Sequence, residues 1–464
     1  MAARRSERPG VTAPVTRTPL TAQQRRLAAG LVMAVMLVAF EVTSVITALP
    51  TITDELGGDS LYGVTLAVYT LANLVALVAT GEFSDRRGPA LPFVLCITTL
   101  IIGLVVAAIA PSMTWVVIGR ALQGAGTGGF TPIAYSLVKR AFVADRQPIM
   151  YASLSAGWVL PSLFAPALSG WVTDTFGWEW VFLGIIPFAI AVGALAVGPM
   201  MHFGSLQAGA DNSAKTRSRI PTAIVAAGGI GLLVTGLRSA NIFLALAMAV
   251  AGAALAFPAL RQLFPAGYLR ARLGFPAIVA CRILATATFL GADSFIPLAA
   301  DRIHGQRPLV QGFVIIGAAV SWTAGAWISA RRPAVNPATA IRNGFLLLLL
   351  GLVLVAPVLW SGWPLIAVFF SWAVGGLGMG LLFNPATVAA MSYAVDGSEG
   401  EVSSQIALAD SVGFSLMGGI GGATVAVADR TSWSLASALG TNFALAAALA
   451  LLGVFAARRV RSLT

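Results

Sequence analysis

Apolar runs of about twenty residues, separated by short polar loops, recur along almost the whole chain. A helix of about 20 apolar residues crosses the hydrocarbon core of a bilayer, so we expect these runs to be membrane spans. Composition agrees, because 58% of the 464 residues are hydrophobic and only 10% are charged, against about 25% charged in soluble proteins. The alternating segments of a transmembrane β-barrel are not visible. The sequence therefore predicts an all-α membrane protein.

The apolar runs predict fourteen spans. They cover residues 27–52, 61–83, 90–110, 114–138, 148–173, 179–201, 221–237, 241–260, 273–298, 309–329, 340–360, 363–394, 402–428 and 435–457. With the N-terminus inside, the inside segments carry 23 of the 29 Lys and Arg and the outside loops carry 4. This asymmetry follows the positive-inside rule and predicts that both termini are cytoplasmic. The net charge of +11 is thus a topology signal, and it does not indicate nucleic-acid binding.

Two short motifs occur twice. SDRRGP at 84–89 is echoed by SARRP at 329–333, 245 residues later, and the GxGxG at 124–128 is repeated at 376–380, 252 residues later. Both offsets exceed half of the chain, so additional residues must separate the repeats. The predicted domains are a basic tail (1–26), a six-helix bundle (27–201), a linker with two inserted helices (202–272), a second six-helix bundle (273–457) and a tail (458–464). Paired bundles around a midplane site are a recurring plan of secondary transporters.

A glutamate, Glu41, lies near the middle of the first span. A charged side chain there costs roughly 2.5–3.5 kcal/mol, so it needs polar surroundings. At 100° per residue, Thr43, Ser44 and Thr47 fall on one side of the helix and the apolar residues fall on the other. We therefore expect Glu41 to face a protein interior or an aqueous cavity.

Other spans also carry isolated polar side chains. In the fourth span, Arg120, Gln123 and Thr127 share one face, and their positions do not require contact with Glu41. In the ninth span, Arg282 and Asp293 are roughly 16 Å apart along the axis, too far to pair directly. Asp410 lies in the thirteenth span. Each of these groups is either a structural ion pair or cavity-lining polar group, or, for the acids, a carboxylate that gains and loses a proton. A carboxyl group in a low-dielectric site exchanges its proton nearer neutral pH, as a proton-coupled transporter requires.

Several stretches resemble motifs of the major facilitator superfamily, and in particular its branch of fourteen-span drug:proton antiporters. They are FEVTSVITALP (40–50), GEFSDRRGPAL (81–91), RALQGAGTGG (120–129), SAGWVLPSLFAPALSGW (155–171) and GWEWVFLGIIP (177–187). The resemblance implies the major facilitator fold: two six-helix bundles plus two inserted helices, fourteen spans in all. The sequence departs from the family pattern at Glu41, where Asp is usual, and at Ala165 and Ser169, where Gly is usual.

The resemblance also implies roles for individual residues. Glu41 would act in proton coupling with assistance from Arg120, and our mechanism adds Asp293 as a second acid. Asp85 would latch the cytoplasmic gate with Arg86, within a motif that includes Gly81 and Gly88. Pro166 and Gly170 of the antiporter motif would allow close helix packing and bending. The predicted substrate cavity comprises Glu41, Thr43, Ser44, Thr47, Gln123, Thr127, Arg282 and Asp410.

These observations predict proton-coupled efflux of amphipathic or hydrophobic small molecules by alternating access. The partners would be a lipophilic substrate, protons and the bilayer. We expect a monomer in a bacterial inner membrane, driven by the proton gradient without cofactor or metal. Two alternatives stay open: a facilitator or importer of a metabolite, and a lipid-handling membrane protein of the same fold. An enzyme is not expected, because no nucleophile with a base and no metal cluster is recognisable.

Overall fold

A computed structural model of the chain describes residues 19–57, 61–205, 218–238, 241–306, 308–332 and 335–462. Residues 1–18, 206–217 and 463–464, which belong to the two predicted tails and the linker, lie outside the described residues. Within the described ranges every regular element is a helix.

The first half of the chain holds nine helices in the described ranges. They are α1 (Ala22–Leu56), α2 (Tyr62–Arg87), α3 (Ala90–Ala108), α4 (Met113–Thr127), α5 (Phe130–Ala141), α6 (Gln147–Ala156), α7 (Val159–Phe176), α8 (Glu179–Leu183) and α9 (Ile185–Ser205). The inserted segment holds α10 (Ile220–Arg238), α11 (Ile242–Leu263) and the 3-10 turn η2 (Tyr268–Arg270).

The second half of the chain, after the inserted segment, is also entirely helical in the described ranges. Its elements are α12 (Phe275–Asp293), α13 (Ile296–Arg302), α14 (Pro308–Ala330), α15 (Pro337–Val355), η3 (Ala356–Leu359), α16 (Leu365–Met391), α17 (Glu399–Arg430) and α18 (Leu435–Ala457).

Eleven helices of the described chain are long and apolar enough to cross a membrane. Two shorter apolar helices, Ile220–Gly236 and Ile315–Ala330, lie at two further predicted spans. The predicted span at 114–138 is divided into α4 and α5. A Cβ at Gly128 would lie 2.4 Å from the Asn73 carbonyl oxygen, so this break sits where the backbones of α2 and α4 meet. The all-helical membrane architecture is confirmed, whereas the count of fourteen spans stays a prediction.

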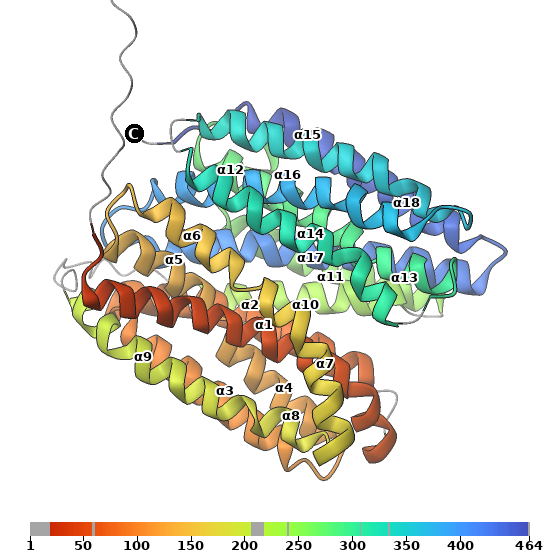
Figure 1. The fold of residues 1–464 in the computed structure, drawn as a ribbon, viewed down its shortest axis with the longest axis horizontal. Coiled ribbons are helices and arrows are strands. Elements are labelled where there is room, and N and C mark those ends of the chain that lie inside the picture. Colours follow the sequence, from red (N-terminus) through yellow and green to blue (C-terminus); the bar gives the residue numbers. More distant parts are fainter. Residues whose placement is uncertain are drawn as a thin grey trace, which may run out of the picture.

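The two halves form separate groups of helices that meet at one end (Figure 1). Contacts between them join α2 and α5 to α17, and α6 to α14 and α16. The approach is closest where α2 crosses α17: a Cβ at Gly81 would lie 2.5 Å from the Gly400 carbonyl oxygen, and one at Gly400 would lie 2.3 Å from that of Gly81. Only glycines allow backbones to pass this closely.

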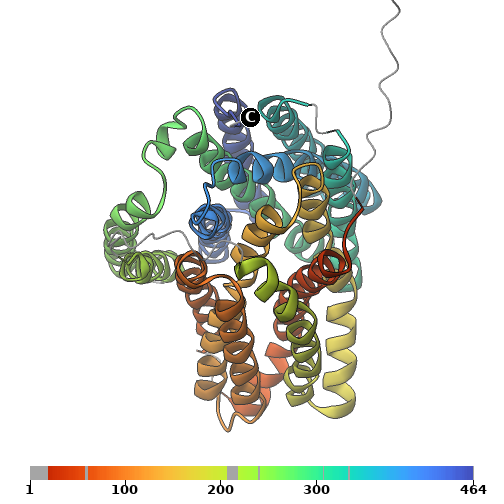
Figure 2. The same cartoon turned by 90° about the vertical axis from the view of Figure 1, so that its left-hand side faces the viewer.

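The inserted helices α10 and α11 pair with each other at the periphery (Figure 2). Helix α10 packs on α2 and on α17, and thus on both halves. From the end of α11 the chain runs as an arc through η2 to α12 (Figure 2). Small side chains on α10, including Ala223 and Ala226, form a buried cluster with Leu74 of α2 and Leu408 of α17.

Candidate functional site

The first polar site joins α1 to α4. Glu41 and Arg120 are both fully buried, and the Arg120 Nη1 donates a hydrogen bond to the Glu41 Oε1. The same nitrogen donates to Gln123 Oε1 at 2.6 Å. The guanidinium carbon of Arg120 lies 4.1 Å from the centre of the Tyr69 ring, and the Tyr69 hydroxyl bonds to Thr127 Oγ1 at 2.8 Å. These residues of α1, α2 and α4 therefore form one buried network.

This ion pair has unused bonding capacity. The Glu41 Oε2 and the Arg120 Nε are buried, and neither has a hydrogen-bond partner among the described residues. Removing one member of a buried pair leaves an uncompensated charge and costs about 3–5 kcal/mol. The sequence did not require this contact, since a helical wheel gives the angle of a side chain around its axis but not its depth relative to another helix.

The second polar site joins α12 to α16. The Trp372 Nε1 donates to Asp293 Oδ1 at 2.7 Å, and Trp372 is fully buried. The Phe289 ring stacks on the Trp372 indole, with centroids 5.1 Å apart and planes 10° apart. None of the ion pairs within the described residues includes Asp293. This carboxyl group therefore has a neutral donor where Glu41 has a cation.

The two sites occupy corresponding positions of the repeat. Asp293 and Trp372 each lie 252 residues after Glu41 and Arg120, the same offset that relates the two GxGxG motifs. In both pairs the partners are 79 residues apart. Sequence reasoning missed the Trp372 contact. The repeat offset relates Trp372 to Arg120, but it indicates a contact with Asp293 only once the Glu41–Arg120 pair is known from the structure.

The third polar site joins α12 to α17 and α16. The Arg282 Nε donates to Asp410 Oδ1 at 2.8 Å, and its Nη1 donates to Thr387 Oγ1 at 2.7 Å. Its guanidinium carbon lies 3.4 Å from the centre of the Phe383 ring. The helical spacing indicated that Arg282 and Asp293 are too far apart to pair. In the structure Arg282 pairs with Asp410. The Tyr135 side chain of α5 lies beside Arg282, so this site touches the first half as well.

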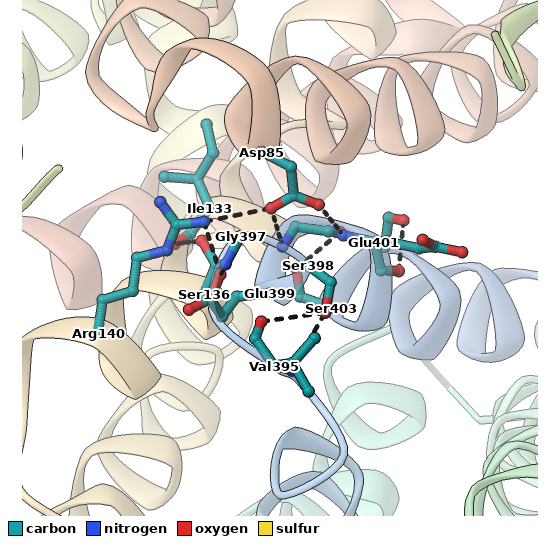
Figure 3. A network of polar contacts seen from close by, with 12 residues as sticks. Asp85, Ile133, Ser136, Arg140, Val395, Gly397, Ser398, Glu399, Glu401 and Ser403 are labelled. Carbon is teal, nitrogen blue, oxygen red and sulfur yellow. Dashed lines mark hydrogen bonds and ion pairs between the residues drawn. The ribbon is translucent and has the colours of Figure 1, made fainter. Parts of the chain in front are cut away.

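The gate residues lie where the two halves meet (Figure 3). The Asp85 carboxylate accepts bonds from the backbone N–H groups of Gly400 and Glu401, both at 2.7 Å. These groups belong to the first turn of α17, whose positive dipole end attracts an anion. The Arg140 Nη2 lies 3.2 Å from Asp85 and 2.8 Å from Glu399, and so bridges α2, α5 and α17.

The predicted partner of Asp85 is corrected. Arg86 pairs with Glu82 on its own helix at 2.6 Å, and it is Arg140 that binds Asp85. The sequence did not reveal this because Arg140 and the N-terminus of α17 are distant in the chain. Of the two motif glycines, Gly81 allows the crossing with α17, while Gly88 ends α2 with a φ of 79°.

The packing role predicted for Gly170 is wrong in this structure. A Cβ at Gly170 would meet no atom within 4 Å, and Pro166 lies exposed inside α7. The contact with α1 is made by residues that depart from the family pattern. Ser169 is buried and donates to the Ser44 carbonyl oxygen at 2.7 Å, and Ala165 is fully buried.

The other predicted cavity residues do not gather in one place. Thr43 and Thr47 bond to backbone carbonyl groups of their own helix, at 2.7 Å and 2.9 Å, and Thr47 is exposed. The Ser44 hydroxyl is buried without a hydrogen-bond partner among the described residues. Two cavities of the structure lie away from these residues, one beside Tyr268 and one beside Phe83.

Comparison with known proteins identifies the class. A family model described as Major Facilitator Superfamily matches residues 31–422. The chain therefore belongs to the major facilitator superfamily, a family of multi-pass membrane transporters and not of enzymes.

Relatives place the chain near multidrug efflux proteins. It is 26% identical over 379 residues to a probable multidrug-efflux transporter of Mycobacterium tuberculosis, covering 76% of this chain and 77% of that protein. It is 29% identical over 182 residues to multidrug resistance protein 3 of Bacillus subtilis, covering 39% of this chain and 35% of that protein. It is 31% identical over 192 residues to an uncharacterized transporter of the same superfamily in M. tuberculosis, covering 39% of this chain and only 28% of that protein.

Solved structures agree on the fold. The human organic anion transporter TETRAN superposes with a TM-score of 0.72 at 14% identity, covering 94% of this chain and 100% of that one. The proton:xylose symporter XylE superposes with a TM-score of 0.67 at 12% identity, covering 93% and 94%. At these identities the likeness concerns the fold alone.

Proposed function

We propose that this chain is a proton-coupled antiporter that exports amphipathic or hydrophobic small molecules by alternating access. The observation that carries the proposal is the buried Glu41–Arg120 pair, in which one carboxylate oxygen has no hydrogen-bond partner among the described residues. Ionisable residues inside a membrane are costly, and they mark ion and proton pathways. The multidrug-efflux relatives support the substrate class.

In this mechanism Glu41 carries the coupling proton. When Glu41 is ionised, its charge balances that of Arg120, and when it is protonated, the cation of Arg120 is left unbalanced inside the protein. The two protonation states therefore favour different arrangements of α1 and α4. Asp293 is the second acid of the cycle, because it can take up a proton without losing an ion pair among the described residues. The membrane potential contributes about 2.3 kcal/mol per charge per 100 mV, enough to bias such a cycle.

The contacts between the halves support alternating access. They gather at the end that carries Asp85, Arg140 and Glu399, which the positive-inside rule predicts to be cytoplasmic. A structure closed at that end corresponds to an outward-facing state. The proposal includes fourteen spans, cytoplasmic termini, a monomer and a place in a bacterial inner membrane, where export of this kind would confer antibiotic resistance.

Transport into inside-out vesicles tests this function. Vesicles that contain the protein are energised by an outside-acid or an inside-acid pH gradient, and uptake of lipophilic cations and neutral amphiphiles is measured. We expect uptake only with the inside-acid gradient, and its loss in Glu41→Gln, while the matched neutralisation Asp429→Asn at an exposed ion pair leaves it unchanged. Uptake that does not depend on the pH gradient would favour the alternative of a facilitator. If only phospholipid is moved, the alternative of a lipid-handling protein would be favoured.

A further inference from the structure

A basic pocket lies under the arc that links the inserted helices to the second half. It has a volume of about 500 Å³ and lies between the end of α11 and the start of α12. Its lining residues are Arg261, Pro265, Ala266, Gly267, Tyr268, Leu269, Arg270 and Arg272. Three of these eight side chains are arginines, although only 10% of the chain is charged.

No acid among the described residues forms an ion pair with the arginines of this pocket, Arg261, Arg270 and Arg272. All three side chains are exposed. Arg120 and Arg282, in contrast, pair with a buried and a partly buried carboxylate, respectively. Three unbalanced guanidinium groups around one cavity form a site for an anion with several oxygen atoms, such as a phosphate ester.

The loop that carries the arginines is held in a defined shape. Gly267 and Ala271 both have positive φ, at 89° and 43°, which turns the chain tightly on either side of η2. The Arg459 Nη1 donates to the Arg270 carbonyl oxygen at 2.7 Å, and the Gly274 N–H donates to the Arg459 carbonyl oxygen at 3.0 Å. The buried Tyr268 ring packs on Phe264 with centroids 4.9 Å apart. The pocket is thus a built part of the structure.

The surroundings favour a lipid over a free phosphate. Beside the arginines, Leu269 is 59% exposed, Leu273 is 60% exposed and Phe257 is 49% exposed. The pocket also lies at the end of a predicted span, where the headgroups of the inner leaflet are expected. An anion with acyl chains would contact both the arginines and these apolar side chains, whereas a soluble phosphate would contact only the arginines.

We propose that this pocket binds the phosphate headgroup of an anionic phospholipid, with its acyl chains against the exposed apolar side chains of α11 and the arc. Basic pockets between helices on the cytoplasmic side are suited to such headgroups. The proposal gives the inserted helices a role that the transport mechanism does not use. It does not depend on proton coupling or on the exported substrate.

Lipid retention by the purified full-length protein tests the proposal. The protein in non-ionic detergent is mixed with phosphatidylglycerol, and native mass spectrometry measures the fraction of protein ions that retain lipid. Each basic residue near a membrane surface strengthens binding roughly fivefold, so R261Q/R270Q/R272Q should weaken retention at least about tenfold. The matched control R331Q/R332Q/R342Q removes three exposed arginines from the same predicted side and should retain lipid like the wild type. If the triple variant is unstable, Arg272→Gln alone should still lower retention several-fold.

Two competitors identify the source of the phosphate. Phosphatidylcholine, which is zwitterionic, should be retained weakly by all variants, and glycerol phosphate should fail to displace phosphatidylglycerol at the same concentration. Equal retention by the wild type and R261Q/R270Q/R272Q would overturn the proposal. Displacement by glycerol phosphate would also overturn it, because the site would then bind a soluble phosphate ester.

Discussion

The two halves of the molecule accommodate a buried carboxyl group in different ways. At corresponding positions, the first half pairs Glu41 with Arg120 and the second half pairs Asp293 with Trp372. The first arrangement is a buried ion pair, and the second is a carboxyl group bound to a neutral indole. The difference means that protonation has opposite consequences for local charge: it creates an unbalanced cation in the first half, and it removes an unbalanced anion in the second. Corresponding positions of the repeat thus hold two acids with different partners.

Breaking the Glu41–Arg120 ion pair should have the largest effect on stability. Arg120→Gln leaves the Glu41 carboxylate buried without a counter-charge, which should lower the free energy of unfolding by about 3–5 kcal/mol. Thermal or denaturant unfolding in detergent measures this loss. The control is Glu41→Gln/Arg120→Gln, which removes both charges and should recover most of the stability. A double variant as unstable as Arg120→Gln would show that the pair does not act through charge balance.

A smaller effect is expected when the donor of the second half is removed. Trp372→Phe keeps the stacking on Phe289 but removes the N–H that bonds to Asp293. Because a hydrogen bond to a charged group contributes about 1.5–3 kcal/mol, unfolding should become easier by that amount. A loss as large as that of Arg120→Gln would remove the contrast between the halves.

The arrangement of the two halves also depends on the close crossing of α2 and α17. Gly81→Ala would place a methyl group 2.5 Å from the Gly400 carbonyl oxygen, and such overpacking costs about 1–3 kcal/mol. We expect the closed end to open, so that a cysteine at a gate position that is buried in the closed structure becomes more reactive to a water-soluble maleimide. The control Gly170→Ala meets no atom within 4 Å and should leave the labelling rate unchanged. Equal labelling of the two variants would contradict the close crossing of α2 and α17.

The smallest effect on stability is expected from neutralising the second acid. Asp293→Asn keeps an oxygen to accept the Trp372 N–H and removes no ion pair, so the free energy of unfolding should change by less than about 1 kcal/mol. Glu41→Gln, in contrast, leaves the buried guanidinium of Arg120 unpaired and should cost several times more. Parallel unfolding measurements of the two variants compare the halves directly, and equal losses would show that the sites are equivalent.

Much of the fold was predictable because a bilayer imposes a simple rule on sequence. The apolar runs predicted the all-helical membrane architecture that the structure shows. The division into two bundles with an inserted segment and the cytoplasmic side read from the arginines stay predictions. The division of the fourth span into α4 and α5 was not predicted, because it depends on glycines that contact α2.

The contacts of the candidate site were harder to predict from the sequence than the fold. The sequence singled out Glu41, Arg120, Asp293, Arg282 and Asp410, but it did not show which of them pair. Helical angles say nothing of how two helices are shifted along each other, and the binding of Asp85 to α17 depends on a helix end more than 300 residues away. The predicted roles in coupling and gating stay predictions that only functional measurements can decide.

Solute-induced proton release is the most direct test of Glu41 as the coupling acid. The purified protein in weakly buffered detergent is mixed with each of a panel of lipophilic cations and neutral amphiphiles, and the released protons are measured with a pH indicator. We expect that at least one compound releases protons from the wild type and from Asp429→Asn but not from Glu41→Gln. If Glu41→Gln is unstable, Glu41→Gln/Arg120→Gln replaces it and should also release none. Release from these variants equal to that of the wild type would contradict the assignment of Glu41 as the coupling acid.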